Sequence, residues 1–320
     1  MDMTQAGAVL QLVGGFVVLI GGAEVLVRAA SKLGIRLGMS PITVGATIVA
    51  FGTSAPEFVV SMSAAVGGEA DLALGNVLGS NIANIALVLG LAALVRPIPV
   101  DPRVLKLEYV VALAATASIP FIVSDLEVTR VEGAGLAAGF LCFLLIYVAR
   151  SRAGRAGATD RLDAPAPERG GLARLILFGV LGLGALIFGS RLVVDSATWF
   201  ADEYQWGGAV VGATLLALGT SLPEIATSMV AAVRGAHGIA IGNVLGSNIF
   251  NLLLVLGSVS AVQPLVADPL QRDRLTWLML GLTVGLFPIL RFGKRVSRLE
   301  GVLLLAGYGG LSWMMVEAVK

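Results

Sequence analysis

Two stretches of this 320-residue sequence repeat each other at a constant offset of 167 residues. Residues 45–62 (GATIVAFGTSAPEFVVSM) match residues 212–229 (GATLLALGTSLPEIATSM) at 11 of 18 positions. Residues 72–90 (LALGNVLGSNIANIALVLG) match residues 239–257 (IAIGNVLGSNIFNLLLVLG) at 14 of 19 positions. Matched blocks in the same order indicate one structural unit built twice, so the fold has to join two similar halves.

The composition predicts that both halves lie in a lipid bilayer. Hydrophobic residues make up 57% of the chain and charged residues 13%, about half of the ~25% that is usual in soluble domains. These values exclude a water-soluble globule, a disordered chain and a nucleic-acid binder with a basic face. A spanning helix needs about 20 mostly apolar residues. We therefore expect an all-α polytopic membrane protein with ten transmembrane helices, at residues 8–29, 41–64, 72–94, 104–123, 131–149, 173–198, 208–232, 239–262, 275–291 and 299–317.

The Lys and Arg residues predict the orientation of these spans. With the N-terminus outside, the inside loops carry seventeen of them and the outside segments carry four, which agrees with the excess of positive charge in cytoplasmic loops. No basic residue precedes the first apolar run, which is longer than that of a signal peptide, so this run is expected to be a span. We expect the protein in the inner (plasma) membrane with both termini outside.

One polar segment, 150–171, divides the chain, and we interpret it as a flexible cytoplasmic linker. The first half, 1–149, holds five spans and the repeat unit 45–90; the second half, 172–320, holds five spans and the repeat unit 212–257. Because five is odd and the linker lies inside, the second half enters the membrane from the opposite side. Such inverted repeats build secondary transporters, with the binding site between the repeats near the midplane.

Each half carries the motif Gly-Thr-Ser-x-Pro-Glu in an otherwise apolar span, ending at Glu57 and at Glu224. The proline removes a helical hydrogen bond, so we expect a kink that frees the carbonyl oxygens of Gly52 and Gly219. A carboxylate at the helix centre costs at least ~2.5–3.5 kcal/mol, and two at matched positions favour a functional role over a structural, protonated one. Ser54 lies on the same face as Glu57. Such oxygen ligands are those that hard cations prefer.

The second motif, Gly-Asn-x-x-Gly-Ser-Asn-x-x-Asn, occurs once in each half. Ser80 and Asn84 are four residues apart, as are Ser247 and Asn251, so each pair adds a hydroxyl and an amide to one helix face. The asparagines have a second interpretation as hydrogen-bonding groups between helices. Two carboxylates carry a charge of −2, which one calcium ion or two sodium ions neutralise, so the charge count alone does not choose the ion.

Charged pairs also occur in the first and sixth spans. Glu24 and Arg28 are four residues apart, and Arg191 and Asp195 occupy the equivalent positions of the second half. We expect each pair to form an ion pair within its helix.

The paired motifs resemble the alpha-repeats of the cation/calcium antiporter superfamily, most of all those of its prokaryotic sodium/calcium exchangers, over nearly the whole chain. The resemblance implies a ten-helix bundle in which helices two, three, seven and eight are broken in the middle and surround several sodium sites and one calcium site. It implies that helices one and six slide as a pair to alternate access. Calcium and sodium would be the transported ions, without a cofactor. The chain would contact the lipid bilayer, with neither nucleic acid nor an obligate protein partner.

The resemblance further implies which residues bind the ions. Glu57 and Glu224 resemble carboxylates that calcium and sodium share. The other implied ligands are the hydroxyls of Thr53, Ser54, Ser80, Thr220, Ser221 and Ser247, the amide of Asn84, and the backbone carbonyls of Ala50 and Ala217. Asn251 is the matching amide of the second half. Some relatives have Asp there, which is typical of the potassium-dependent branch, so Asn251 argues against potassium co-transport.

Other functions are compatible with parts of this pattern. A calcium/proton antiporter would titrate the same two glutamates, a passive cation channel would need no counter-ion, and a non-transporting scaffold would tolerate loss of both carboxylates. Proton-exchanging relatives usually have the acid in a Gly-Asn-x-x-Glu context, whereas here it lies in Thr-Ser-x-Pro-Glu, which favours sodium. An enzyme is disfavoured because no nucleophile–base pair or phosphate-binding loop occurs.

Overall fold

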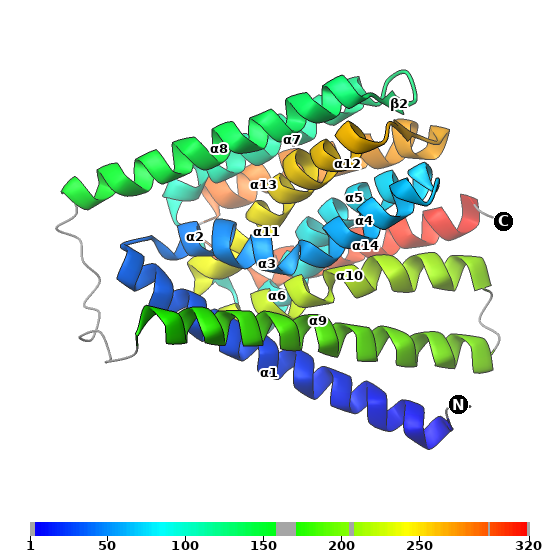
Figure 1. Ribbon diagram of the computed structural model, residues 1–320, viewed down its shortest axis with the longest axis horizontal. Helices are drawn as coiled ribbons and strands as arrows, with labels where there is room; N and C mark the ends of the chain where they lie inside the picture. Colours follow the sequence, from blue (N-terminus) through cyan, green and yellow to red (C-terminus); the bar gives the residue numbers. More distant parts are fainter. Residues whose placement is uncertain (1–3, 158–170, 205–207, 294, 319–320) are drawn as a thin grey trace.

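The computed structural model describes residues 4–157, 171–204, 208–293 and 295–318, and nearly all of them are helical (Figure 1). In this described part, six helices are long and apolar enough to cross a membrane, or seven when one bent pair counts as one span. Large apolar side chains are exposed along these helices, for example Leu10, Val17 and Val180, whereas many polar side chains are buried inside the bundle. This inside-polar, outside-apolar arrangement is that of a multi-pass membrane protein.

The first half contains the following elements, which together overlap the first five expected spans: α1 (Gln5–Leu37), α2 (Pro41–Val44), the π-helical η1 (Gly45–Val49), α3 (Ala50–Thr53), α4 (Ala55–Val66), α5 (Ala70–Ala83), the π-helical η2 (Asn84–Val88), α6 (Leu89–Val95), β1 (Ile98–Pro99), the 3-10 helix η3 (Pro102–Lys106), α7 (Glu108–Ile122), β2 (Glu127–Val128) and α8 (Arg130–Gly157).

The second half repeats this order and overlaps the other five expected spans: α9 (Leu172–Glu203), α10 (Gly208–Val233), α11 (His237–Ile249), the π-helical η4 (Phe250–Leu256), α12 (Gly257–Val262), β3 (Leu265–Val266), the π-helical η5 (Gln271–Leu275), α13 (Thr276–Phe292), β4 (Arg295–Val296) and α14 (Arg298–Ala318).

The expected proline kink occurs in the first half, whereas the matching helix of the second half is continuous. Residues 41–53 and 55–66 form two helices bent by 42° at Ser54, with Pro56 in the first turn of α4. In contrast, α10 continues as one helix through Pro223. The carbonyl of Gly219, which Pro223 cannot bond, accepts a hydrogen bond of 2.9 Å from the hydroxyl of Ser190 in α9. The equivalent residue of the first half is alanine, so no such donor is present there.

The third and eighth spans are continuous, so the expectation that they are broken in the middle is wrong. They run over Ala70–Val95 and His237–Val262. Each contains a π-helical segment instead of a break, η2 in one and η4 in the other. A π-helical turn widens the ring of each hydrogen bond by one residue and is common at functional sites. Asn84 and Asn251, the two candidate amides, both lie in these segments.

Helices α1 and α9 pack closely against each other along one side of the bundle (Figure 1). A Cβ atom added to Gly22 would lie 2.7 Å from the backbone nitrogen of Leu186, and one added to Gly182 would lie 2.7 Å from that of Leu26. Only glycine permits this approach. The two helices therefore form a tightly packed pair.

An ion-pair cluster joins this helical pair to the rest of the bundle. Glu24 of α1 contacts Arg28, as expected, and also Arg234, which follows α10. The Nε atom of Arg234 lies 2.6 Å from Oε2 of Glu24. Within the described residues, Arg191 and Asp195 form no ion pair, so that expectation is wrong. A basic residue four positions before an acidic one is the less favourable order along a helix.

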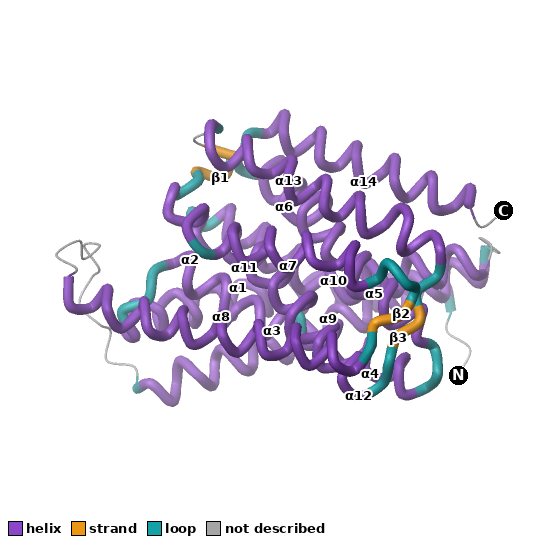
Figure 2. Tube along the Cα trace, turned by 90° about the horizontal axis from the view of Figure 1, so that it is seen from above, coloured by secondary structure: helices purple, strands orange, loops and turns teal. Residues whose placement is uncertain are grey.

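Two short antiparallel sheets join the halves. Strand β1 pairs with β4, and β2 pairs with β3, so each sheet contains one strand from either half. The two sheets lie at opposite ends of the bundle (Figure 2). The start of α1 and the end of α14 lie at the same end as β2 and β3.

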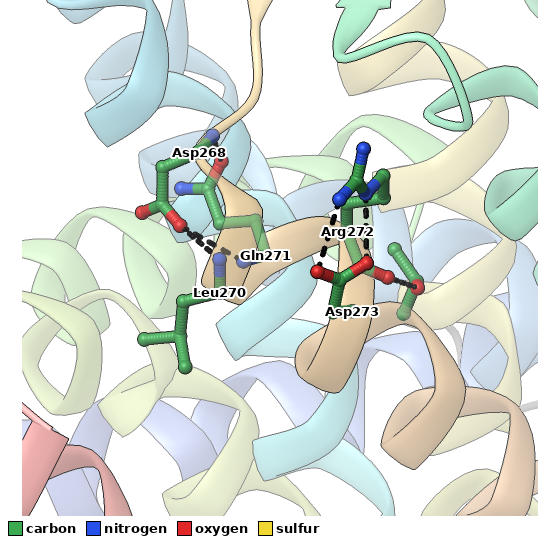
Figure 3. A network of polar contacts seen from close by, with 6 residues as sticks. Asp268, Leu270, Gln271, Arg272 and Asp273 are labelled. Carbon is green, nitrogen blue, oxygen red and sulfur yellow. Dashed lines mark hydrogen bonds and ion pairs between the residues drawn. The ribbon is translucent and has the colours of Figure 1, made fainter.

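The turn that leads into η5 and α13 is held by local hydrogen bonds at Asp268 (Figure 3). One carboxylate oxygen of Asp268 accepts from the backbone nitrogens of Leu270 and Gln271 at 2.5 and 3.0 Å, and the side chain of Gln271 accepts from the backbone nitrogen of Asp268 at 3.2 Å. This reciprocal arrangement satisfies the free N–H groups of a helix start. Gln271 also donates to the carbonyl of Asp71 at 2.7 Å, so α5 is fixed to this turn.

Candidate cation-binding site

Two carboxyl groups lie in the middle of the bundle. Glu57 is in the first turn of α4, directly after the break at Ser54, and Glu224 lies on α10, one residue after Pro223. Both side chains are completely buried. No basic side chain in the described part of the chain pairs with either of them. Buried carboxylates without a counter-charge are costly, so each needs either a proton or a cation to neutralise it.

The two carboxyl groups differ in their hydrogen bonds. The Oε1 atom of Glu224 accepts from the hydroxyls of Ser54 at 3.1 Å and Ser247 at 3.5 Å, one from each half. Among the described residues, neither oxygen of Glu57 has a hydrogen-bond partner, and the equivalent hydroxyls of Ser221 and Ser80 are unpartnered as well. The site is therefore asymmetric even though its residues come from a repeat. Glu224 is held in place, and Glu57 has both oxygens available for a ligand.

The two candidate amides are also unpartnered. Asn84 and Asn251 are fully buried, and all four of their polar side-chain atoms lack a hydrogen-bond partner in the described structure. Buried polar side chains nearly always find a partner, so four such atoms require an explanation. The alternative that these asparagines bond to neighbouring helices therefore has no support in the hydrogen bonds. Both amides are therefore available to a ligand.

The threonines of the first motif bond to asparagines of the opposite half. Thr53 donates to Oδ1 of Asn243 at 3.2 Å, and Thr220 donates to Oδ1 of Asn76 at 3.5 Å. Asn76 and Asn243 were not among the expected site residues. The signal that could have identified them is their identity in both copies of the second motif.

The structure describes contacts for one of the two candidate backbone carbonyls, that of Ala50. The carbonyl of Ala50 accepts from the backbone nitrogen of Ser54 at 3.0 Å and from the hydroxyl of Thr53 at 3.4 Å. Ala217 falls in residues 208–217 of α10, whose side chains are outside the described ones, so its expected role is not addressed by a contact.

The donor set is one of oxygens only. Within the described residues, no group of three or more His, Cys, Asp or Glu side chains comes together as a metal cluster. The buried centre instead combines two carboxyls with hydroxyl and amide groups, which suits hard cations such as sodium and calcium rather than transition metals. A polytopic helical bundle with unpaired carboxyls of this kind at its centre is characteristic of an ion-translocating membrane protein.

The family of the chain follows from comparison with known proteins. The family model described as "sodium/calcium exchanger protein" matches residues 7–149 and 174–316. The chain belongs to this sodium/calcium exchanger family.

Individual relatives agree over most of their length. The sodium/calcium exchanger MaX1 of Methanosarcina acetivorans is 31% identical over 313 residues, covering 87% of this chain and 89% of MaX1. The inner membrane protein YrbG of Escherichia coli strain K12 is 38% identical over 277 residues, covering 85% of each chain. The solved structure of the sodium-calcium exchanger NCX_Mj, soaked with sodium and strontium, superposes with a TM-score of 0.81 at 29% identity, covering 94% of this chain and 96% of that one.

Proposed function

We propose that the protein is an antiporter that exchanges sodium for calcium across the inner membrane by alternating access. The observation that carries this proposal is the buried pair Glu57 and Glu224, three of whose four carboxylate oxygens have no partner among the described residues. Family membership and the fold shared with NCX_Mj support cation/calcium antiport. The names of MaX1 and NCX_Mj support sodium as the counter-ion.

The ligands of the proposed site are those that the sequence predicted. Glu57 and Glu224 would bind either ion. Hydroxyl oxygens of Ser54, Ser80, Ser221 and Ser247, the threonines 53 and 220, the amides of Asn84 and Asn251 and the carbonyls of Ala50 and Ala217 would complete the coordination. The lack of hydrogen-bond partners on Ser80, Ser221, Asn84 and Asn251 supports their assignment.

Charge explains how one site serves two ions. The two carboxylates carry −2, which one calcium ion or two sodium ions neutralise. Because each set would use the same Glu57 and Glu224, binding of one set excludes the other. Exchange then follows when the site opens to one side of the membrane at a time, so that sodium entering down its gradient drives calcium outward.

The membrane arrangement that we propose is ten spans in two inverted halves. The halves are 1–149 and 172–320, joined by a cytoplasmic linker at 150–171, with both termini outside. The family model matches a stretch in either half, and each small sheet pairs one strand of each half. The equivalent strands β1 and β3 lie at opposite ends of the bundle, which supports an inverted arrangement (Figure 2). The α1–α9 pair would slide against the remaining helices.

A calcium/proton antiporter is the second candidate. It is favoured by the same unpartnered oxygens of Glu57, because a proton neutralises a buried carboxylate as a sodium ion does. Sodium and proton coupling therefore have to be separated by transport measurements.

The experiment is uptake of radioactive calcium into proteoliposomes that are preloaded with sodium and diluted into sodium-free choline, potassium or acidified buffer. We expect uptake that requires internal sodium and is lost in Glu57→Gln and in Glu224→Gln. The exposed Glu127 in β2 supplies the matched control, and Glu127→Gln is expected to transport normally. Uptake that ignores sodium and follows an imposed pH gradient would establish proton coupling instead. Flux without any counter-ion would exclude antiport.

A further inference from the structure

We propose that Asn76 and Asn243 are positioning residues for ion binding. Each would hold the hydroxyl proton of a threonine from the opposite half, so that the threonine oxygen is presented to the cation. This inference rests on the proposed function of the Glu57–Glu224 site and adds two residues that do not themselves bind the ion.

The geometry is a pair of matched hydrogen-bond chains. In one, Thr53 of α3 donates to Oδ1 of Asn243 in α11 at 3.2 Å, and Nδ2 of Asn243 donates to Ser228 of α10 at 3.0 Å. In the other, the residues are those found 167 positions away in the sequence: Thr220 donates to Oδ1 of Asn76 at 3.5 Å, and Nδ2 of Asn76 donates to Ser61 at 2.9 Å. All six side chains are buried.

The orientation of the amide is fixed by a group that can only accept. Nδ2 of Asn76 also lies 3.4 Å from the backbone carbonyl oxygen of Glu57. A carbonyl has no proton to give, so the NH2 group of Asn76 must lie on that side. The amide oxygen then faces Thr220 and can only accept. Asn243, the matching residue of the repeat, has the same orientation, with Oδ1 toward Thr53 and Nδ2 toward Ser228.

This orientation decides where the threonine proton lies. A hydroxyl has one proton and two lone pairs. The hydroxyl of Thr53 also lies 3.4 Å from the backbone carbonyl oxygen of Ala50, a second possible acceptor. When Asn243 accepts the proton, the lone pairs of Thr53 remain for a cation. Without the amide oxygen, the proton would turn to the carbonyl of Ala50 and compete with the cation for that proposed ligand.

The test is a double-mutant cycle on calcium-dependent thermal stabilisation of the detergent-purified protein, from which an apparent calcium affinity is obtained. We expect Asn243→Leu and Thr53→Val each to weaken this affinity about tenfold, the value of one hydrogen bond to a charged site. Because Asn243 acts through the hydroxyl of Thr53, the double variant should be no more than slightly weaker than either single variant. Thr53→Ser, which keeps the hydroxyl, should keep nearly normal affinity.

The repeat provides a matched control. Within the described residues, the hydrogen bonds of Asn76 go to Glu57, Ser61 and Thr220 and not to Thr53. Thr53→Val combined with Asn76→Leu should therefore weaken affinity about a hundredfold, the product of two independent effects. Equal losses in the partnered and unpartnered combinations would overturn the inference. Should Asn243→Leu fail to fold, Ser228→Ala is the replacement variant. Its loss of affinity must disappear in the Thr53→Val background, and persistence of that loss would also overturn the inference.

This readout separates the inference from the proposed function. Calcium stabilisation does not depend on which counter-ion is exchanged, so a proton-coupled protein would still show the cycle. A wild-type protein that no cation stabilises would contradict the proposed site itself, and the inference would fall with it. A wild type that responds to calcium, with additive partnered variants, would contradict the inference alone.

Discussion

At the scale of single residues, the two copies of one motif have different surroundings. The carboxylate of Glu224 is held by Ser54 and Ser247, whereas that of Glu57 is unpartnered in the described structure. The carbonyl of Gly219 is bonded by Ser190, and the first half has alanine at the equivalent position. The hydrogen bonds of the two identical motifs therefore differ because the residues that face the two motifs are not identical.

The hydrogen bond from Ser190 to Gly219 is testable by Ser190→Ala. This change leaves a buried carbonyl without its donor, which is expected to lower the free energy of unfolding by about 1–3 kcal/mol. The measurement is the thermal unfolding midpoint of the purified protein. The control is Ser196→Ala in the same helix, because the one hydrogen bond of Ser196 to a described residue goes to the carbonyl of Leu192, one turn earlier, at 2.8 Å. Equal midpoints for the two variants would contradict the role of Ser190.

The motifs could be predicted because each violates the rules for an ordinary span. Carboxyls, prolines and amides in apolar helices are costly, and their repetition locates them. Ser190 could not be predicted as a partner, because its contact depends on how α9 packs on α10. The bonds between Thr53 and Asn243 and between Thr220 and Asn76 depend likewise on the packing of one half against the other.

At the scale of helices, hydropathy predicted where the spans lie, but it did not predict the π-helical segments or the close packing of helices. The kink predicted from Pro56 is confirmed as a 42° bend, whereas α10, for which Pro223 predicted the same, continues as one helix. The third and eighth spans contain the π-helical segments η2 and η4 instead of the expected breaks. These segments could not be predicted, because a π turn has no sequence signature as clear as a proline. The close packing of α1 on α9 involves Gly22 and Gly182, whereas a Cβ atom added to the nearby Gly21 or Gly184 would meet nothing within 4 Å, so the sequence alone does not tell these glycines apart.

Adjacent glycines of α1 provide a test of this packing. Gly22→Ala places a methyl group against the backbone of α9, so we expect it to destabilise the protein by about 1–3 kcal/mol. Gly21→Ala is the control, since a Cβ atom there would meet nothing within 4 Å. That change should be neutral or stabilise by up to about 1 kcal/mol through helix propensity. The measurement is the thermal unfolding midpoint of both variants, and the opposite order would contradict the packing.

At the scale of the whole molecule, both halves contribute residues to the candidate site. Ser54 of the first half bonds to Glu224 of the second, and the amide of Asn248 donates to the carbonyl of Asn81 at 3.3 Å across the halves. Both small sheets also pair strands of different halves. Neither half alone contains both carboxyl groups of the candidate site, although each contains the same motifs.

This interlocking predicts that a chain cut between α8 and α9 still assembles. Two polypeptides, 1–157 and 171–320, are expected to co-purify when expressed together and to show calcium uptake in proteoliposomes. Either polypeptide alone should show none, because it lacks half of the ligands. Failure to co-purify would show that the contacts between halves do not hold without the linker, whereas uptake by one half alone would contradict the shared site.

The two sheets have a mechanical consequence for helices α1 and α9. Strand β1, which follows α6, pairs with β4, which precedes α14, and β2 pairs with β3, so backbone hydrogen bonds connect these parts of the two halves. Within the described residues, no backbone–backbone hydrogen bond joins α1 or α9 to another helix. Displacement of this pair would break contacts such as Glu24–Arg234, which is partly exposed and worth about 0–1 kcal/mol. The buried hydrogen bond from Ser190 to the carbonyl of Gly219 would have to break as well. Salt screens neither this bond nor the apolar contacts of the pair, so lipids or detergents that wet its apolar surface should change the rate of such a displacement more than salt does.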